Sequence, residues 1–237
     1  MTLIRSLVFL AFFYALSTAA AIAMTPLLLG RRRWIVQTIG VWARGVVFLL
    51  RVICGVRMEV RGRQHMPTGP ALIAAKHQGV FDTIGPFTFL PDAAFVLKKE
   101  LLAIPFYGWY AIKGGMVTVD RAGHAAALKK LVKDTRERMA EDRQVIIFPE
   151  GTRKEPGAAP DYKPGIAALY RDLGLPCTPM ATNSGAHWPA HGFLRRPGTI
   201  VFEFLEPIPA GLKRGEFMKE LQARIEAASD ALLAEGL

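Results

Sequence analysis

The feature that most constrains this chain is an uncharged apolar segment near its N-terminus. None of the residues from 6 to 30 is charged, and Arg31, Arg32 and Arg33 follow directly. A helix rises about 1.5 Å per residue, so the segment forms roughly 37 Å of helix, enough to cross a hydrocarbon core of about 30 Å. Helices in the core of a globular protein are usually shorter. The segment therefore predicts a membrane anchor rather than a buried core helix.

A cleaved signal peptide is the alternative for the same segment. Arg5 supplies a basic start, residues 7–16 an apolar stretch and residues 21–23 a small-residue cleavage pattern. Against cleavage, the apolar sequence continues through Leu29 and the three arginines follow at once. The positive-inside rule holds such an arginine cluster in the cytosol. We therefore expect the segment to be retained, with the rest of the chain on the cytosolic side.

The charge of the chain is concentrated next to this apolar sequence. Of the net charge of +10, the first 63 residues supply +8, from nine arginines and the single acidic residue Glu59. A nucleic-acid binder usually carries its basic patch on the folded domain, whereas basic residues interleaved with apolar ones are typical of contact with anionic lipid. We expect membrane lipids as partners and no nucleic acid. A second apolar stretch, residues 34–50, is interrupted by Arg44 and predicts an interfacial or hairpin helix.

The remainder of the chain alternates short apolar runs with amphipathic patterns. We expect N-terminal membrane-anchoring helices over residues 1–58 and a catalytic domain over residues 59–237. The runs predict seven strands, at Val56–Val60, Ala71–Ala75, Ala93–Leu97, Met116–Val119, Val145–Phe148, Thr178–Ala181 and Thr199–Phe204. Helical patterns cover residues 124–141, residues 166–173 and a stripe from Phe217 to Leu232. The alternation predicts an α/β fold with a central, mostly parallel sheet flanked by helices.

Common signatures of cofactor and metal sites are missing from the sequence. There is no Walker A pattern, no dinucleotide-binding glycine pattern and no G-x-S-x-G nucleophile elbow. Cys54 and Cys177 have neither a disulfide framework nor metal-site spacing. His187 and His191 are separated by Pro189, which disfavours a helical metal pair. We expect no metal and no bound cofactor.

A histidine and an aspartate follow the predicted strand at residues 71–75. His77 and Asp82 are five positions apart, and at a strand-to-helix turn the two side chains can meet. Gly79 would give the turn its conformational freedom. The carboxylate can then accept a hydrogen bond from one ring nitrogen and leave the other free as a base. The alternative is a helix-capping aspartate beside an incidental histidine.

Three further clusters follow or contain predicted strands. Glu150, Gly151, Thr152 and Arg153 come after the run at residues 145–148, and such residues at the end of a strand suit an anion pocket. The alternative is a solvated turn with a surface ion pair. Residues 115–121 form a strand that ends in an Asp-Arg pair, which can equally be a surface salt bridge. Residues 175–181 can be an ordinary core strand.

Together, in this order, the clusters resemble the glycerolipid acyltransferase family, the 1-acyl-sn-glycerol-3-phosphate acyltransferases. The matching blocks are H-x₄-D at His77 and Asp82, the glycine-to-arginine strand at residues 115–121, F-P-E-G-T-R at residues 148–153 and, loosely, the proline-flanked strand at residues 176–181. The last block departs most, with Cys177 and Thr178 where small branched apolar residues are usual. A family-like Lys-x-Glu-Leu also begins at Lys98. The resemblance spans roughly residues 60–185.

The resemblance implies transfer of a fatty acyl group from a thioester, acyl-CoA or acyl carrier protein, to the free hydroxyl of a lysophosphatidate. His77 would be the general base and Asp82 would fix its tautomer; a neutral imidazole suits this task at pH 7. The other implied roles are acceptor phosphate binding by Arg121, Arg153 and Lys98, and shaping of the acceptor pocket by Glu150, Gly151 and Thr152. Because acyl thioesters are made in the cytosol, the implied location is the cytosolic face of the inner (cytoplasmic) membrane.

Other functions remain open at this point. The same blocks serve acyltransferases for other lysophospholipids, lyso-aminolipids or glycerol 3-phosphate. A membrane-anchored lipid-binding protein would keep the pocket without the chemistry, and a hydrolase would use His77 to activate water. An acyl-enzyme on Cys177 is disfavoured because this cysteine lies inside an apolar run.

Overall fold

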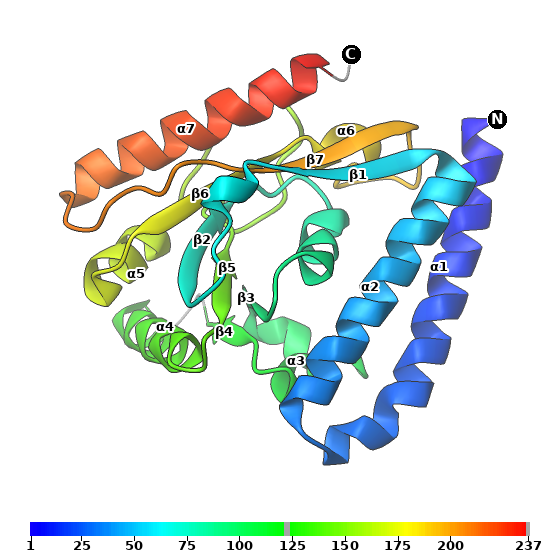
Figure 1. Cartoon of the computed structure of the whole chain (residues 1–237), viewed down its shortest axis with the longest axis horizontal. Coiled ribbons are helices and arrows are strands. Elements are labelled where there is room, and N and C mark those ends of the chain that lie inside the picture. The colour runs from blue at the N-terminus through cyan, green and yellow to red at the C-terminus, as the bar shows by residue number, and fades with distance from the viewer. Residues whose placement is uncertain (121–123, 236–237) are drawn as a thin grey trace.

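The computed structural model describes residues 1–120 and 124–235, and within them seven strands form one sheet (Figure 1). The order across the sheet is β1-β7-β6-β2-β5-β3-β4. The strands are β1 (Val56–Arg61), β2 (Ala71–Ala75), β3 (Ala93–Lys98), β4 (Val117–Val119), β5 (Gln144–Ile147), β6 (Cys177–Thr182) and β7 (Gly198–Phe204). Each of the seven predicted runs forms a strand, with ends that differ by at most one residue from those predicted.

Most of the sheet is parallel, as the alternation of strands and helices predicts. Strands β2 to β6 run in one direction, whereas β7 is antiparallel to β6, and β1 is parallel to β7. The four neighbours β2, β5, β3 and β4 therefore end at the same edge of the sheet. In open α/β sheets this carboxyl edge is where ligands bind.

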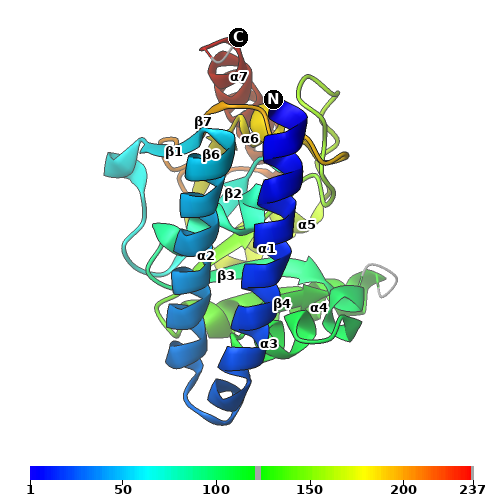
Figure 2. The ribbon, with the colours of Figure 1, turned by 90° about the vertical axis from the view of Figure 1, so that its right-hand side faces the viewer.

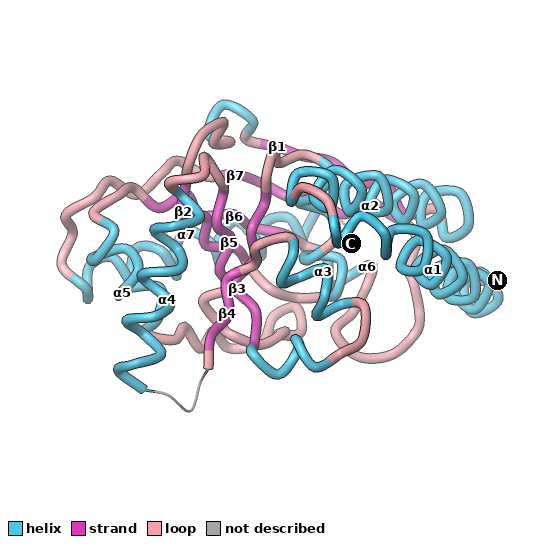
Figure 3. Tube along the Cα trace, turned by 90° about the horizontal axis from the view of Figure 1, so that it is seen from below, coloured by secondary structure: helices cyan, strands magenta, loops and turns pink. Residues whose placement is uncertain are grey.

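Helices cover both faces of the sheet (Figure 3). The α-helices are α1 (Thr2–Met24), α2 (Arg32–Cys54), α3 (Tyr107–Lys113), α4 (His124–Met139), α5 (Gly165–Leu173), α6 (Ser184–His187) and α7 (Arg214–Glu235). Short 3₁₀ helices are η1 (Thr25–Leu29), η2 (Arg63–His65), η3 (Val80–Thr83), η4 (Gly85–Thr88) and η5 (Lys99–Ala103). One core joins α4, α5 and α7 to Leu72 and Ala74 of β2, and the other joins α1 and α2 to Ile73 and Ala75, as expected where successive side chains of a strand point to opposite faces.

The two N-terminal helices form an antiparallel hairpin along one side of the sheet (Figure 2). The interfacial or hairpin helix predicted at residues 34–50 is α2. The uncharged segment is not one continuous α-helix: α1 ends at Met24 and η1 follows, because Pro26 lacks the N–H that a regular α-helical turn needs. Both helices are long and apolar enough to cross a membrane by length and composition. Only 11% and 28% of their most apolar windows are buried, so neither is an enclosed core helix.

The hairpin also packs against the domain that follows it. Phe9 of α1 and Val46 and Leu50 of α2 are almost wholly buried in the same core as Ile73 of β2. Strand β1 begins at Val56, so the sheet starts two residues before the predicted boundary at residue 58. That boundary stays a prediction.

Candidate active site

The histidine and the aspartate of the H-x₄-D block meet at the carboxyl end of β2. His77 Nδ1 lies 3.0 Å from Asp82 Oδ2. The same carboxylate oxygen accepts the backbone N–H groups of Gln78 at 2.6 Å and Gly79 at 2.8 Å. Asp82 sits in η3, a single 3₁₀ turn, and its side chain is buried. The expected strand-to-helix turn is present, and it brings the two residues together.

Gly79 is needed in this turn for a different reason from the one that the sequence predicts. Its backbone is extended, with φ of −152° and ψ of 174°, a conformation that any residue adopts. A Cβ atom at this position would instead lie 2.3 Å from the backbone oxygen of Trp188. Glycine is therefore needed for a close approach of two backbone segments, not for conformational freedom.

The imidazole of His77 is held on one face by an aromatic ring. Phe148, the first residue after β5, stacks on it with ring centroids 3.9 Å apart and an interplanar angle of 16°. Asp82 engages Nδ1, and within residues 1–120 and 124–235 no hydrogen-bond partner is seen for Nε2. The His77 side chain is 14% exposed and lines a large cavity. The ring is therefore fixed in orientation with one nitrogen available to a ligand.

The block at residues 148–153 divides between the cavity and the structure behind it. Gly151, Thr152 and Arg153 line the cavity, and Gly151 turns the chain with φ of +64°, a value that favours glycine. Arg153 is exposed, and its guanidinium donates to the backbone oxygen of Ala190 at 3.3 Å. Glu150 is not among the lining residues: it is buried, and its Oε2 accepts the backbone N–H of His77 at 3.1 Å.

One of the other two residues predicted to hold phosphate lies on a neighbouring strand. Lys98, the last residue of β3, is exposed and lines the cavity. Arg121 lies outside the described residues. Asp120, directly before it, also lines the cavity and forms an ion pair with Lys99 at 3.2 Å. The carboxyl edge of the sheet thus gathers His77, Lys98 and Arg153 around one space.

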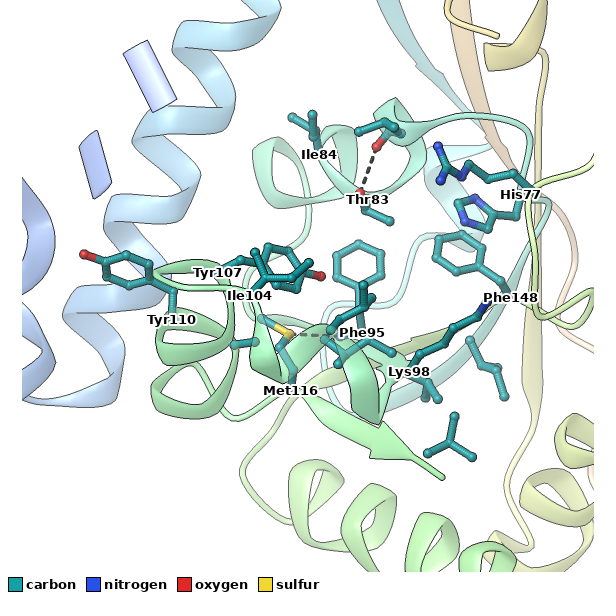
Figure 4. Close-up of a pocket in the computed structure, with 18 of the residues that line it drawn as sticks. His77, Thr83, Ile84, Phe95, Lys98, Ile104, Tyr107, Tyr110, Met116 and Phe148 are labelled. Atoms are coloured by element: carbon teal, nitrogen blue, oxygen red, sulfur yellow. Dashed lines mark hydrogen bonds between the residues drawn. The ribbon is translucent and has the colours of Figure 1, made fainter. Parts of the chain in front are cut away.

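The cavity has a volume of about 1120 Å³ and extends from His77 toward the N-terminal hairpin. Figure 4 shows the rings of His77 and Phe148 at one end, with Phe95, Met116 and Tyr107 lying farther toward α3. The hairpin itself contributes lining residues such as Phe13 and Trp42. Charged side chains such as Lys98, Asp120 and Arg153 come from the carboxyl edge of the sheet, whereas most of the wall is apolar. An apolar pocket with a few polar groups is typical of a binding site for a largely apolar ligand.

A cluster of buried ion pairs lies behind His77, and the sequence does not predict it. Lys76, the residue before His77, is 3% exposed, and its ammonium contacts Glu150 at 2.7 Å and Glu226 of α7 at 2.7 Å. The hydroxyl of Tyr162 donates to Glu226 at 2.8 Å. Burial disfavours the charged form of Lys76 and so lowers its pKa. The hydrogen bonds with the two carboxylates have the larger combined effect, and the pKa of Lys76 is raised. The only sequence signal is a lysine that directly follows an apolar strand.

Cys177 is fully buried in β6, and burial raises the pKa of its thiol to about 12. A thiol in this environment is not an accessible nucleophile. Within residues 1–120 and 124–235, no three His, Cys, Asp or Glu side chains are grouped so that they could hold a metal ion.

Comparisons with known proteins place this geometry in a family. The family model described as Acyltransferase matches residues 57–183, which include β2 to β6 and the H-x₄-D and F-P-E-G-T-R blocks. The 1-acyl-sn-glycerol-3-phosphate acyltransferase of Pseudomonas aeruginosa is 37% identical over 205 residues, covering 86% of this chain and 79% of that protein. The alpha form of the mouse enzyme of the same name is 30% identical over 56% of this chain, and the match spans 48% of the mouse protein.

A solved structure shows the same fold over almost the whole chain. The crystal structure of the 1-acyl-sn-glycerophosphate (LPA) acyltransferase, PlsC, from Thermotoga maritima matches with a TM-score of 0.79. The match covers 98% of both chains at 23% sequence identity, so the N-terminal hairpin is part of the shared fold. The family model covers more than half of the chain, and the bacterial relative aligns over most of its length. The chain therefore belongs to the acyltransferase family that includes the 1-acyl-sn-glycerol-3-phosphate acyltransferases.

Proposed function

We propose that this acyltransferase moves a fatty acyl group from a thioester, acyl-CoA or acyl carrier protein, to the free hydroxyl of 1-acyl-sn-glycerol 3-phosphate, forming phosphatidate. The observation that supports the proposal most is the contact between His77 and Asp82. Asp82 Oδ2 lies 3.0 Å from Nδ1 of the His77 ring, which leaves Nε2 for a ligand in a mostly apolar cavity. The names of the relatives support the acceptor.

In this mechanism the His77 Nε2 atom takes the proton of the acceptor hydroxyl as its oxygen attacks the thioester carbonyl. The new C–O bond forms, the C–S bond breaks, and the proton passes from the imidazolium to the departing thiolate. Asp82 keeps the Nδ1 proton in place and stabilises the imidazolium while it exists. A positioned general base of this kind accounts for about 10²–10⁴ in rate.

The exposed cations near His77 suit the phosphate of the acceptor. Arg153 offers a planar fork of N–H donors that matches phosphate oxygens, and Lys98 adds a point charge from the end of β3. We assign the acceptor phosphate to these two residues and to Arg121. Gly151 and Thr152 shape the pocket beside them, and Glu150 acts from behind it by holding the His77 backbone.

The apolar part of the cavity suits acyl chains, and the hairpin brings it to the membrane. The hairpin residues Phe13 and Trp42 line the cavity, so a lipid in the bilayer has a short path to His77. We place the protein in the inner (cytoplasmic) membrane with its catalytic domain on the cytosolic face. Arg31, Arg32 and Arg33 at the turn of the hairpin suit contact with anionic lipid headgroups.

The proposed function is tested by following thioester consumption with a panel of acceptors. The full-length protein in detergent is given one labelled acyl-CoA or acyl carrier protein together with lysophosphatidate, lysophosphatidylcholine, glycerol 3-phosphate or no acceptor. We expect fast consumption of the thioester only when lysophosphatidate is the acceptor, with phosphatidate as the labelled product. Equal consumption without acceptor would identify a hydrolase, and preference for another acceptor would reassign the substrate.

A further inference from the structure

The structure contains a buried cluster that connects the C-terminal helix to the catalytic turn. It consists of Lys76, Glu150, Glu226 and Tyr162. The Lys76 ammonium faces away from the cavity and lies between two carboxylates, with Glu150 Oε1 at 2.7 Å and the Glu226 oxygens at 2.9 and 2.7 Å. A buried charge with this many partners has one well-defined position.

Glu150 carries the effect of this cluster to the catalytic histidine. Its two oxygens have different partners: Oε1 accepts from Lys76, and Oε2 accepts the backbone N–H of His77 at 3.1 Å. Burial raises the pKa of Glu150, and the Lys76 ammonium opposes that change. Lys76 therefore helps to keep Glu150 ionised, and a carboxylate accepts the His77 N–H better than a protonated acid does.

The end of the cluster that is farthest from His77 is Glu226, on the packed helix α7. Glu226 follows Ile225 on α7, and Leu221 and Ile225 are fully buried against the sheet. The hydroxyl of Tyr162 donates to Glu226 and fixes its carboxylate further. Helix α7 lies beyond residues 57–183, the part of the chain that matches the family model.

We infer that Lys76 and Glu226 are positioning residues for the acyl transfer, and that they orient His77 through Glu150 and its bond to the His77 backbone. The inference rests on the proposed role of His77 as the base. Neither residue touches the cavity, so each acts on the rate of the chemical step rather than on the binding of either substrate. A displacement of about 1 Å at a catalytic group costs as much as a hundredfold in rate.

The test compares Lys76→Met and Glu226→Gln with matched controls in the full-length protein. Lys130→Met removes an exposed lysine that pairs with Asp134 on α4, and Glu220→Gln removes a carboxylate that pairs with Arg224 on α7. Steady-state kinetics give kcat and both KM values, and hydrogen–deuterium exchange reports the backbone amides of residues 76–79. Melting temperatures report the fold, and Lys76→Arg restores the charge.

We expect Lys76→Met to lower kcat at least tenfold and Glu226→Gln severalfold, with both KM values unchanged. We expect Lys76→Arg to recover part of the loss. Exchange at residues 76–79 should be faster in Lys76→Met and Glu226→Gln and unchanged in the controls. If Lys76→Met does not fold, the kinetics and exchange of Glu226→Gln test the inference instead, because glutamine keeps the shape of the glutamate side chain.

Two results would overturn the inference. One is a wild-type kcat in Glu226→Gln. The other is a fall in kcat that only follows the loss of folded protein, with no local change in exchange at residues 76–79. If the wild-type protein transfers no acyl group, the proposed function fails, while the exchange comparison still decides whether the cluster fixes the His77 backbone.

Discussion

The carboxylate of Asp82 holds the backbone of the turn after His77 as well as the His77 imidazole. One oxygen, Oδ2, receives His77 Nδ1 and two backbone N–H groups, while Oδ1 is buried and has no hydrogen-bond partner in the described part of the chain. Three donors on one oxygen tie the conformation of residues 77–79 to the position of the His77 ring, the proposed base. Small changes in this turn should therefore affect catalysis before they affect binding.

Gly79→Ala tests the close approach of this turn to its neighbour. The new Cβ would lie 2.3 Å from the Trp188 backbone oxygen, so the turn must move. We expect a fall in kcat of about a hundredfold, the cost of a displacement near 1 Å at a catalytic group. Gly69→Ala is the control, because nothing lies within 4 Å of its Cβ position. Equal kcat values for the two variants would show that the contact is not needed.

Arg153→Ala tests the phosphate contact. A hydrogen bond to a charged group is worth about 1.5–3 kcal/mol, so kcat/KM for lysophosphatidate should fall roughly tenfold to a hundredfold. Arg153→Lys should recover only part, because lysine cannot reproduce the planar fork. The donor KM should not change, and Arg171→Ala, which removes an exposed arginine on α5, should have no effect. Loss of donor use with unchanged acceptor kinetics would contradict the assignment.

At the scale of elements, α1 is both a candidate membrane helix and part of the protein core. Phe9 is fully buried and meets the Trp188 ring edge-on, with centroids 5.3 Å apart, and the Ser6 hydroxyl accepts the backbone N–H of Arg195 at 2.8 Å. Cleavage near Met24, as the signal-peptide alternative requires, would remove these contacts and open the core.

Phe9→Ala measures how much α1 contributes to the fold. A buried phenylalanine replaced by alanine costs about 3–5 kcal/mol, and for a chain of this size each kcal/mol lowers the melting temperature by about 2–4 °C. Phe12→Ala is the matched control, because Phe12 is 55% exposed on the same helix. We expect a clear fall in melting temperature in detergent for Phe9→Ala alone. Equal melting curves would mean that the hairpin is only an anchor.

The elements that sequence analysis predicts well are those with a long pattern. The stripe through Leu131, Val132 and Met139 identifies α4, and a continuous apolar run identifies β2. Helices α3 and α6 and the 3₁₀ turns are too short to show a period, so they are not predicted. The turn that leads to Asp82 passes close to the backbone of Trp188, which is far along the chain, and no local pattern predicts such a contact.

At the scale of the whole molecule, the sequence indicates the site but not its supports. The family blocks identify His77 and Arg153 because each block follows an apolar strand, and parallel strands bring their ends together. The Lys76–Glu226 contact joins residues 150 positions apart, and no local pattern reports a pairing of that kind. The reversed direction of β1 and β7 likewise depends on how the completed sheet packs, not on either strand alone.

Membrane attachment is a property of the whole molecule, and it is tested by extraction. The exposed apolar faces of α1 and α2 are large, so burial in lipid outweighs the charge attraction of the arginines. We expect the protein to stay in the membrane fraction at high salt and to be released by detergent. Mass spectrometry should find the N-terminus intact. Release by salt alone, or a mature N-terminus near Met24, would contradict the anchor.

The central claim is that His77 acts as the base for acyl transfer to a lysophosphatidate in the membrane. The most direct measurement is the rate at which the full-length protein and its His77→Ala variant form labelled phosphatidate in vesicles that contain lysophosphatidate. We expect a fall in kcat of about 10²–10⁴ in the variant, the usual contribution of a general base, with an unchanged melting temperature and unchanged vesicle binding. Near-normal phosphatidate formation by His77→Ala would contradict it.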